Sequence, residues 1–164
     1  MNGVMMTGKP TSNNQDERRG GQDEGAAETT VALAGDGGCI AEARRLTADF
    51  LTPPGDGGGG GVPARTVGLI QVVVSELVTN ARKYAPGPIL LRLRLTGAAV
   101  EVAVWDSDPV LPTVREADPQ RVGHHGLEIV KAIAQTLTMR PARVGKRITA
   151  LISLRPGPQA AAPC

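Results

Sequence analysis

The most informative segment of the sequence is Glu76-Leu77-Val78-Thr79-Asn80-Ala81-Arg82-Lys83-Tyr84-Ala85. Three of its polar residues, Glu76, Asn80 and Lys83, follow one another at spacings of four and three. Those spacings place the three side chains on one face of a helix, one above another. A carboxylate, an amide and an ammonium that share a helix face are able to bind a ligand as well as to face solvent.

We predict a helix over residues 63–84, because a proline suits its first turn and Pro86-Gly87-Pro88 stops it. One broad arc of this helix is apolar: Leu69, Ile70, Val73, Val74, Leu77, Val78, Ala81 and Tyr84. Glu76 and Asn80 fall inside the edge of that arc, and Lys83 lies just outside it. This position favours a functional role for Glu76 over that of a solvated helix residue. Asparagine is mildly unfavourable in the middle of a helix, and no local hydrogen bond accounts for Asn80 there. Lys83 fits a functional role and an ordinary solvated position equally well.

Two segments that alternate apolar and polar residues follow the helix, at 89–95 and 100–106, and predict an antiparallel hairpin. By this alternation Asp106 ends the core-facing row of the second strand. A carboxylate there needs a partner or a ligand, although a turn residue ahead of Ser107 is the alternative.

The other segments complete an α/β pattern. The predicted elements are a strand at 29–34, a helix at 39–51, a helix that includes 127–137, a short strand at 140–144 and a last strand at 147–154. Residues 1–28 are expected to be a disordered tail and residues 155–164 a flexible one, so the domain is assigned to 29–154. The glycine-rich residues 53–61 are predicted to connect two helices, and residues 107–122 to form a functional lid or a mobile loop.

Composition excludes several classes of protein. The chain has 164 residues, enough for one domain, and its net charge of +2 comes from 18 basic and 16 acidic residues. With only 2% aromatic residues, we expect no direct nucleic-acid partner. Cys39 and Cys164 make neither a disulfide framework nor a metal motif. No apolar run approaches the ~20 residues that span a membrane, and the N-terminus has no secretory signal, so we expect a cytoplasmic protein.

A glycine-bounded segment, Gly123-His124-His125-Gly126, leads directly into a predicted helix. Backbone N–H groups and the helix dipole at such a start favour an anion such as phosphate. Adjacent histidines without nearby cysteine or carboxylate ligands are more often solvent-exposed than metal-bound. In chain order, the motifs supply a carboxylate for an attacking hydroxyl, an amide oxygen for Mg²⁺, a lysine for phosphate and an acceptor for the amine of a base.

In this order the motifs resemble those of the GHKL superfamily, the ATP-binding domain of bacterial sensor histidine kinases, gyrase-type ATPases and Hsp90 chaperones. Within it, the chain is most similar to the stand-alone serine/threonine kinases that act as anti-sigma factors. Residues 76–84 match the N box, 104–109 the first glycine box and 123–127 the second. The resemblance covers residues 29–154 and implies a two-layer α/β sandwich of the Bergerat type, with a mixed β-sheet and helices on one face.

The resemblance also implies a role for each matching residue. Glu76 would be the general base or water-orienting carboxylate, Asn80 the Mg²⁺ ligand, and Lys83 a neighbour of the phosphates. Asp106 would bind the adenine amine. The residues that would hold phosphate along the second glycine box are Gly123, His125, Gly126 and Leu127. ATP and Mg²⁺ are the implied cofactors.

Two departures from the family pattern bear on nucleotide binding. The Asp-x-Gly-x-Gly sequence of the wider superfamily is absent after Asp106, where Ser107-Asp108-Pro109 makes a stiffer turn of a form associated with the anti-sigma-like branch. By the same comparison, Arg147 replaces a threonine that often helps to hold the nucleotide near the last strand.

Three hypotheses follow. The first is an ATP- and Mg²⁺-dependent serine/threonine kinase that phosphorylates an anti-sigma antagonist protein and alternately sequesters a sigma factor; the resemblance suggests a homodimer. The second is a binding module in which ATP is structural or regulatory and a partner is controlled by sequestration. Glu76 favours the kinase, whereas Arg147 and the turn at Pro109 favour the module. The third is an α/β domain that binds no nucleotide.

Overall fold

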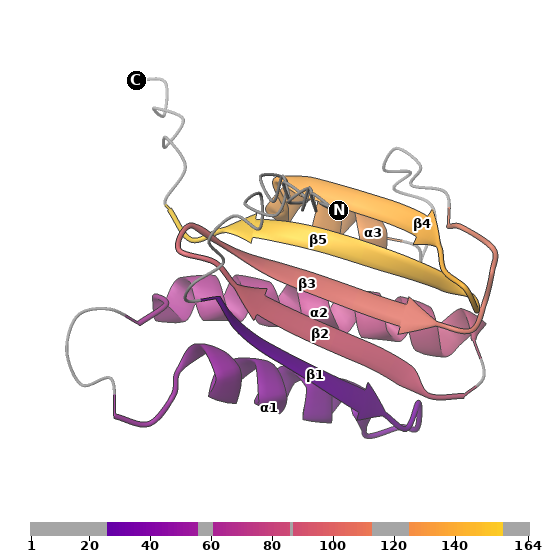
Figure 1. Cartoon of the computed structure of the whole chain (residues 1–164), viewed down its shortest axis with the longest axis horizontal. Helices are drawn as coiled ribbons and strands as arrows, with labels where there is room; N and C mark the ends of the chain where they lie inside the picture. The colour runs from indigo at the N-terminus through magenta and orange to yellow at the C-terminus, as the bar shows by residue number, and fades with distance from the viewer. Residues whose placement is uncertain (1–25, 56–60, 86, 113–124, 156–164) are drawn as a thin grey trace, which may run out of the picture.

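The computed structural model describes residues 26–55, 61–85, 87–112 and 125–155, and Figure 1 labels the helices and strands in them. The strands are β1 (Ala27–Leu33), β2 (Ile89–Leu95), β3 (Ala99–Asp106), β4 (Thr136–Pro141) and β5 (Lys146–Ser153). The helices are α1 (Cys39–Leu51), α2 (Ala64–Tyr84) and α3 (Gly126–Ile133). All elements expected from residue periodicity are present, and only α3 and β4 differ from the expected bounds by more than two residues.

The strands form one sheet in the order β1-β2-β3-β5-β4, and every pair of neighbours in the described sheet is antiparallel. The prediction of a mixed sheet is therefore wrong. The described helices α1 and α2 lie between β1 and β2 in sequence. Strand β2 begins beside the end of β1 and runs antiparallel to it, so that Leu33 pairs with Ile89. A single described helix connects β3 with β4, which run in the same direction, but β5 lies between them and is antiparallel to both.

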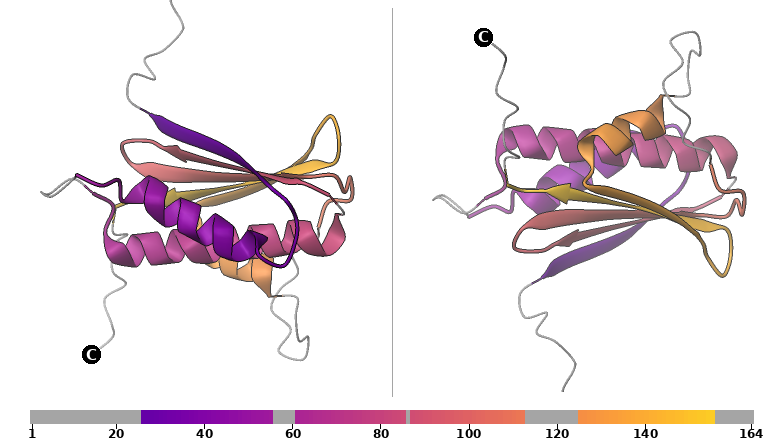
Figure 2. Two further views of the ribbon diagram at one scale, coloured as in Figure 1. Left: turned by 90° about the horizontal axis from the view of Figure 1, so that it is seen from below. Right: turned by 90° about the horizontal axis from the view of Figure 1, so that it is seen from above.

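The described helices cover the same face of the sheet, as Figure 2 shows. Helix α2 lies in the middle of this layer and packs against α1, α3 and the strands β2, β3 and β5. The side chains buried between the layers are mainly aliphatic. The expected two-layer α/β sandwich with helices on one face is thus confirmed. In the described ranges, no helix is both apolar and long enough to cross a membrane.

Helix α3 ends earlier than the apolar spacing predicts. Its C-cap residue Ala134 is extended (φ −78°, ψ 144°), and Leu137, which the spacing assigns to the helix, pairs with Ala150 in the sheet. Strand β4 accordingly occupies 136–141 instead of 140–144. The sequence Thr136-Leu137-Thr138-Met139 also has the alternation of a half-buried strand. Pairing with β5 therefore decides between the two periodicities.

Strand β1 begins at Ala27, so the disordered tail predicted over residues 1–28 extends two residues too far. Glu28 pairs with Arg94 in the sheet, and a carboxylate oxygen lies 3.9 Å from the Arg94 Nε. The remaining predictions for the tails, the connector and the loop concern residues 1–25, 156–164, 56–60 and 113–122, which lie outside the described residues. Gly123 lies outside them as well.

Candidate functional site

Helix α2 presents Glu76 and Asn80 at the border of the core. Both residues are half-buried, beside the buried residues Val67, Ile70, Val73, Val74, Leu77, Val78 and Ala81. The apolar arc is narrower than predicted, because Leu69 and Tyr84 are 40% and 46% exposed. Leu69 lies seven residues before Glu76 and therefore shares its helix face, while Tyr84 is the last residue of the helix. The face that carries Glu76 and Asn80 is thus turned partly away from the sheet.

A glycine at position 126 lets helix α3 approach Glu76 closely. A methyl group on Gly126 would lie 2.5 Å from Glu76 Oε2 and 3.7 Å from Glu76 Cβ. A residue larger than glycine would therefore displace the carboxylate. The fold thus brings together Glu76 of the first motif and Gly126 of the second glycine box, as the functional interpretation requires.

The start of α3 provides backbone N–H groups for an anion. The first intrahelical bond runs from the Ile129 N–H to the His125 carbonyl, and the N–H groups that precede it have no acceptor within the helix. The Leu127 side chain is buried. Its backbone N–H is therefore the group of this residue that would contact a ligand. The His125 ring contacts its own helix, with Nδ1 2.8 Å from the Glu128 carboxylate.

The side-chain amide oxygen of Asn80, Oδ1, is buried and has no hydrogen-bond partner among the described residues. An unsatisfied buried acceptor typically costs about 1–3 kcal/mol, which a bound ligand would offset. Amide oxygens are among the ligands that Mg²⁺ and Ca²⁺ accept in proteins. The structure therefore fits the predicted role of Asn80 as a ligand to Mg²⁺.

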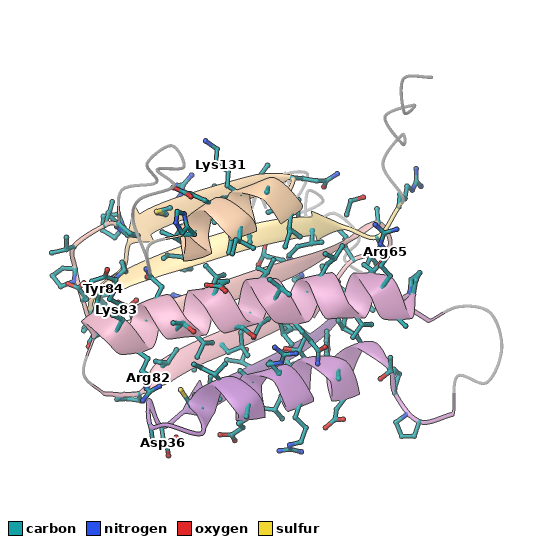
Figure 3. All side chains as sticks on the ribbon, turned by 180° about the vertical axis from the view of Figure 1, so that it is seen from behind. Asp36, Arg65, Arg82, Lys83, Tyr84 and Lys131 are labelled. Atoms are coloured by element: carbon teal, nitrogen blue, oxygen red, sulfur yellow. The ribbon has the colours of Figure 1, made fainter. Side chains whose placement is uncertain are left out.

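Lys83 lies near the exposed C-terminal end of α2, as Figure 3 shows. Its ammonium is 5.2 Å from the centre of the Tyr84 ring, close enough for a cation–π contact. In the part of the chain that the structure describes, it makes no hydrogen bond to Glu76 or Asn80. Lys83 therefore stays a predicted phosphate neighbour that the structure does not bring into contact with the other two residues.

Asp106 faces the core from the end of β3, as the alternation predicts, and its side chain is 2% exposed. Its Oδ1 lies 2.9 Å from the Nζ of Lys146, whose side chain is 1% exposed. The same ammonium donates to the carbonyl of Asp108 at 3.2 Å and to its Oδ2 at 3.3 Å. Removal of one partner of a buried ion pair typically costs about 3–5 kcal/mol, because the other charge stays buried.

Lys146 is the partner of a candidate site residue, and the sequence interpretation missed it. It pairs directly with Asp106 across β3 and β5, so the two side chains share a face of the sheet. The available signal was the alternation of β5, in which the core-facing row that includes Ile148 extends back to Lys146. Arg147 lies on the other face, with its guanidinium 5.6 Å from the centre of the Trp105 ring. The assignment of the nucleotide-facing position to Arg147 is therefore wrong, since the residue that faces Asp106 is a lysine.

The pH dependence of stability is expected to change when Asp108 is replaced by asparagine. The Asp108 carboxylate accepts a hydrogen bond from the Val110 N–H at 3.1 Å. This bond and the Lys146 ammonium lower the pKa of Asp108 below its ordinary value of 3.8, against the opposing effect of partial burial. A lowered pKa in the folded state stabilises the protein above the ordinary pKa, and this contribution is lost as the pH falls through the lowered pKa.

We therefore expect Asp108→Asn to be less stable than the wild type near neutral pH, and the difference to shrink as the pH falls below 3.8. Urea unfolding over a series of pH values measures it. Asp49→Asn is the matched control, because that carboxylate is 65% exposed on α1. A stability difference for Asp108→Asn that stays constant with pH would contradict the expectation.

The chain matches the family described as the histidine kinase-like ATPase domain over residues 40–152. This range is more than half of the chain and contains Glu76, Asn80, Asp106, Gly126 and Lys146. The chain belongs to the histidine kinase-like ATPase family. The expected assignment to the GHKL superfamily is thereby confirmed.

This histidine kinase-like ATPase domain spans only part of the length of the proteins that it matches. The sensor histidine kinase Hik2 of Thermosynechococcus vestitus is 37% identical over 94 residues, which are 49% of this chain and 24% of that protein. A histidine kinase domain from the blue-light activated histidine kinase of Erythrobacter litoralis EL346 has a TM-score of 0.43 and 21% identity, over 70% of this chain and 59% of that one. A second structure of that kinase has a TM-score of 0.43 and 23% identity, over 72% and 41%.

Membership in the histidine kinase-like ATPase family implies that the domain binds ATP. The described residues fit such a ligand. The unpartnered Asn80 oxygen suits a cation that accompanies the phosphates, and the start of α3 suits the phosphates themselves. Asp106 supplies an acceptor at the end of a core strand.

Proposed function

We propose that this histidine kinase-like ATPase domain is an ATP- and Mg²⁺-dependent serine/threonine protein kinase of the anti-sigma type. It phosphorylates a hydroxyl of an antagonist protein and alternately sequesters a sigma factor, as a cytoplasmic homodimer. One observation carries the proposal: the Glu76 carboxylate lies against the start of α3, one helical turn from the unpartnered oxygen of Asn80. This arrangement supports the proposal, because the proposed base and the proposed cation ligand share a helix face beside a helix start that suits phosphate.

Each residue has a separate task in the proposed reaction. The N–H groups at the start of α3 would hold phosphate oxygens, and the Asn80 Oδ1 would hold Mg²⁺. The Glu76 carboxylate orients the attacking hydroxyl and accepts its proton. When bound, MgATP would supply the phosphoryl group, with ADP as the leaving group, and a cation that neutralises the phosphate charge. Because Gly126 has no side chain, Glu76 remains next to the phosphate-binding helix start.

Transfer of phosphate to a protein hydroxyl tests this proposal. The domain is incubated with Mg²⁺, γ-labelled ATP and each candidate antagonist recovered in pull-downs with Mg-ATP and with Mg-ADP. We expect an acid-stable label, because phosphoserine and phosphothreonine survive acid whereas phosphohistidine does not. Asn80→Ala is expected to lose both the transfer and the binding of a fluorescent ATP analogue. An acid-labile label, or undiminished binding by Asn80→Ala, would contradict the proposed specificity or the proposed metal ligand.

A non-catalytic ATP-binding module that sequesters its partner is the second candidate. The exposed position of Lys83 favours it, because the ammonium expected beside the phosphates contacts the Tyr84 ring instead of Glu76 or Asn80. In that case the domain binds the ATP analogue and captures its partner, but no label reaches the partner. The same incubation therefore separates the two candidates.

Replacement of Gly126 by alanine is expected to slow phosphoryl transfer while leaving the fold intact. The added methyl group displaces the Glu76 carboxylate, and a misplacement of about 1 Å typically lowers a rate about 100-fold. Stability changes little, because the group that must move is the end of a flexible side chain. The transfer assay and thermal unfolding measure the two effects. Gly68→Ala on α2 is the control, since its added methyl group meets nothing within 4 Å; equal transfer rates in the two variants would refute the constraint on Glu76.

A further inference from the structure

The ammonium of Lys146 uses its full hydrogen-bonding capacity within the protein. A lysine ammonium has three N–H donors. Three acceptors lie within 3.3 Å of Nζ, namely Asp106 Oδ1, the Asp108 carbonyl and Asp108 Oδ2. With the side chain 1% exposed, Lys146 has no donor left for a ligand. Any effect of Lys146 on a ligand therefore passes through the two aspartates.

The Asp106 carboxylate, in contrast, has acceptor capacity left. A carboxylate offers about four acceptor positions on its two oxygens. The Lys146 ammonium and the Asp108 N–H, each at 2.9 Å, both bind Oδ1. Because both of these donors bind Oδ1, Oδ2 is the oxygen of this carboxylate with acceptor positions left for a further donor.

We propose that Lys146 is the positioning residue of the base-binding part of the site. It balances the charge of the buried Asp106 and directs Oδ2 toward the ligand, so that the site selects a purine that carries an amino group. The inference rests on the proposed nucleotide-binding function. An amino N–H is attracted by an oriented carboxylate, whereas a carbonyl oxygen in its place would face another acceptor.

ATP and ITP separate base recognition from phosphate recognition, because ITP has the same triphosphate and a carbonyl oxygen in place of the amino group. We expect the wild type to bind ATP about tenfold or more tightly than ITP in the presence of Mg²⁺, the effect of one hydrogen bond to a charged group. Isothermal titration calorimetry with each nucleotide measures the ratio of the two Kd values.

In Lys146→Met, which lacks the ammonium, the ratio is expected to fall below about 3, because Asp106 loses the contact that orients it. Asp106→Asn is expected to lower it to a similar extent. The double variant Lys146→Met/Asp106→Asn should show the ratio of the single variants, because Lys146 acts through Asp106 and the two effects are not additive. A merely structural role of Lys146 would weaken both nucleotides equally and leave the ratio unchanged.

Lys131→Met is the matched control, since Lys131 is exposed on α3 (Figure 3) and should keep the wild-type ratio. If thermal unfolding shows that Lys146→Met does not fold, Lys146→Gln takes its place, because glutamine is polar but uncharged and its side chain is one bond too short to replace the contact of Nζ with Asp106 Oδ1; its ratio is expected to fall as well. An unchanged ratio in a folded variant at position 146, or additive effects in the double variant, would overturn the inference.

The failure of this inference is distinguishable from the failure of the proposed function. If the wild type binds neither ATP nor ITP, nucleotide binding itself fails, and the role of Lys146 falls with it. If the wild type binds both nucleotides equally, or if the Lys146 variant retains the preference, the inference alone is overturned and the nucleotide-binding function stands.

Discussion

Replacement of Glu76 by glutamine is expected to lower the rate of phosphoryl transfer about 10²–10⁴-fold, the usual contribution of a general base. Glutamine has nearly the same shape, so it fits beside Gly126, but it lacks the carboxylate that accepts the hydroxyl proton. The affinity for ATP is expected to stay close to that of the wild type, because Asn80 and the start of α3 are unchanged. Single-turnover transfer from γ-labelled ATP and titration with a fluorescent ATP analogue measure the two quantities.

Glu42→Gln is the control for this experiment, because Glu42 is an exposed carboxylate in the first turn of α1. It should transfer phosphate at the wild-type rate. Normal transfer by Glu76→Gln would show that this carboxylate is not the base. Loss of ATP binding in Glu76→Gln would instead place the carboxylate in ligand binding.

Replacement of Gly145 by alanine is expected to destabilise the fold by about 3 kcal/mol or more, which would lower the Tm by roughly 6–12 °C. Gly145 has a φ of +73°, a conformation that costs other residues about 1–2 kcal/mol. The added methyl group would also overlap with the Asp106 carbonyl oxygen and lie 2.7 Å from the Ser107 Cα. Backbone atoms cannot yield as a side chain does, so the start of β5 would separate from the end of β3.

Thermal unfolding measures this loss, with Gly97→Ala as the control. Gly97 lies in the turn between β2 and β3, and a methyl group there would meet nothing within 4 Å. The control is expected to unfold at nearly the wild-type temperature. Equal melting temperatures for the two variants would mean that the turn at Gly145 adapts to a side chain.

The sequence predicts those features of the site that depend on one element alone. Helical spacing places Glu76 and Asn80 on a shared face, and strand alternation places Asp106 on the core side, since side chains alternate with a period of two. The partner of Asp106 depends on which strand lies beside β3. That partner is Lys146 because β5 is inserted between β3 and β4, an arrangement that no local pattern encodes.

The same limit explains the differences in the fold. Leu137 satisfies both the helical spacing before it and the alternation around it, and its pairing with Ala150 decides in favour of the strand. The approach of Gly126 to Glu76 is equally non-local, because α2 and α3 lie on either side of the β2–β3 hairpin in sequence. Local periodicity therefore predicts the elements well and their neighbours poorly.

The position of β5 has a consequence for the order in which the protein is built. It is the last described strand in the sequence, yet it has a neighbour on each side in the sheet. While the ribosome is still making the chain, β3 has an open edge and β4 has no strand to pair with, a state that is prone to aggregation. A chain that stops before Lys146 lacks the buried partner of Asp106 as well as the strand that joins the two parts of the sheet. The described sheet is therefore complete only after β5 has been synthesised.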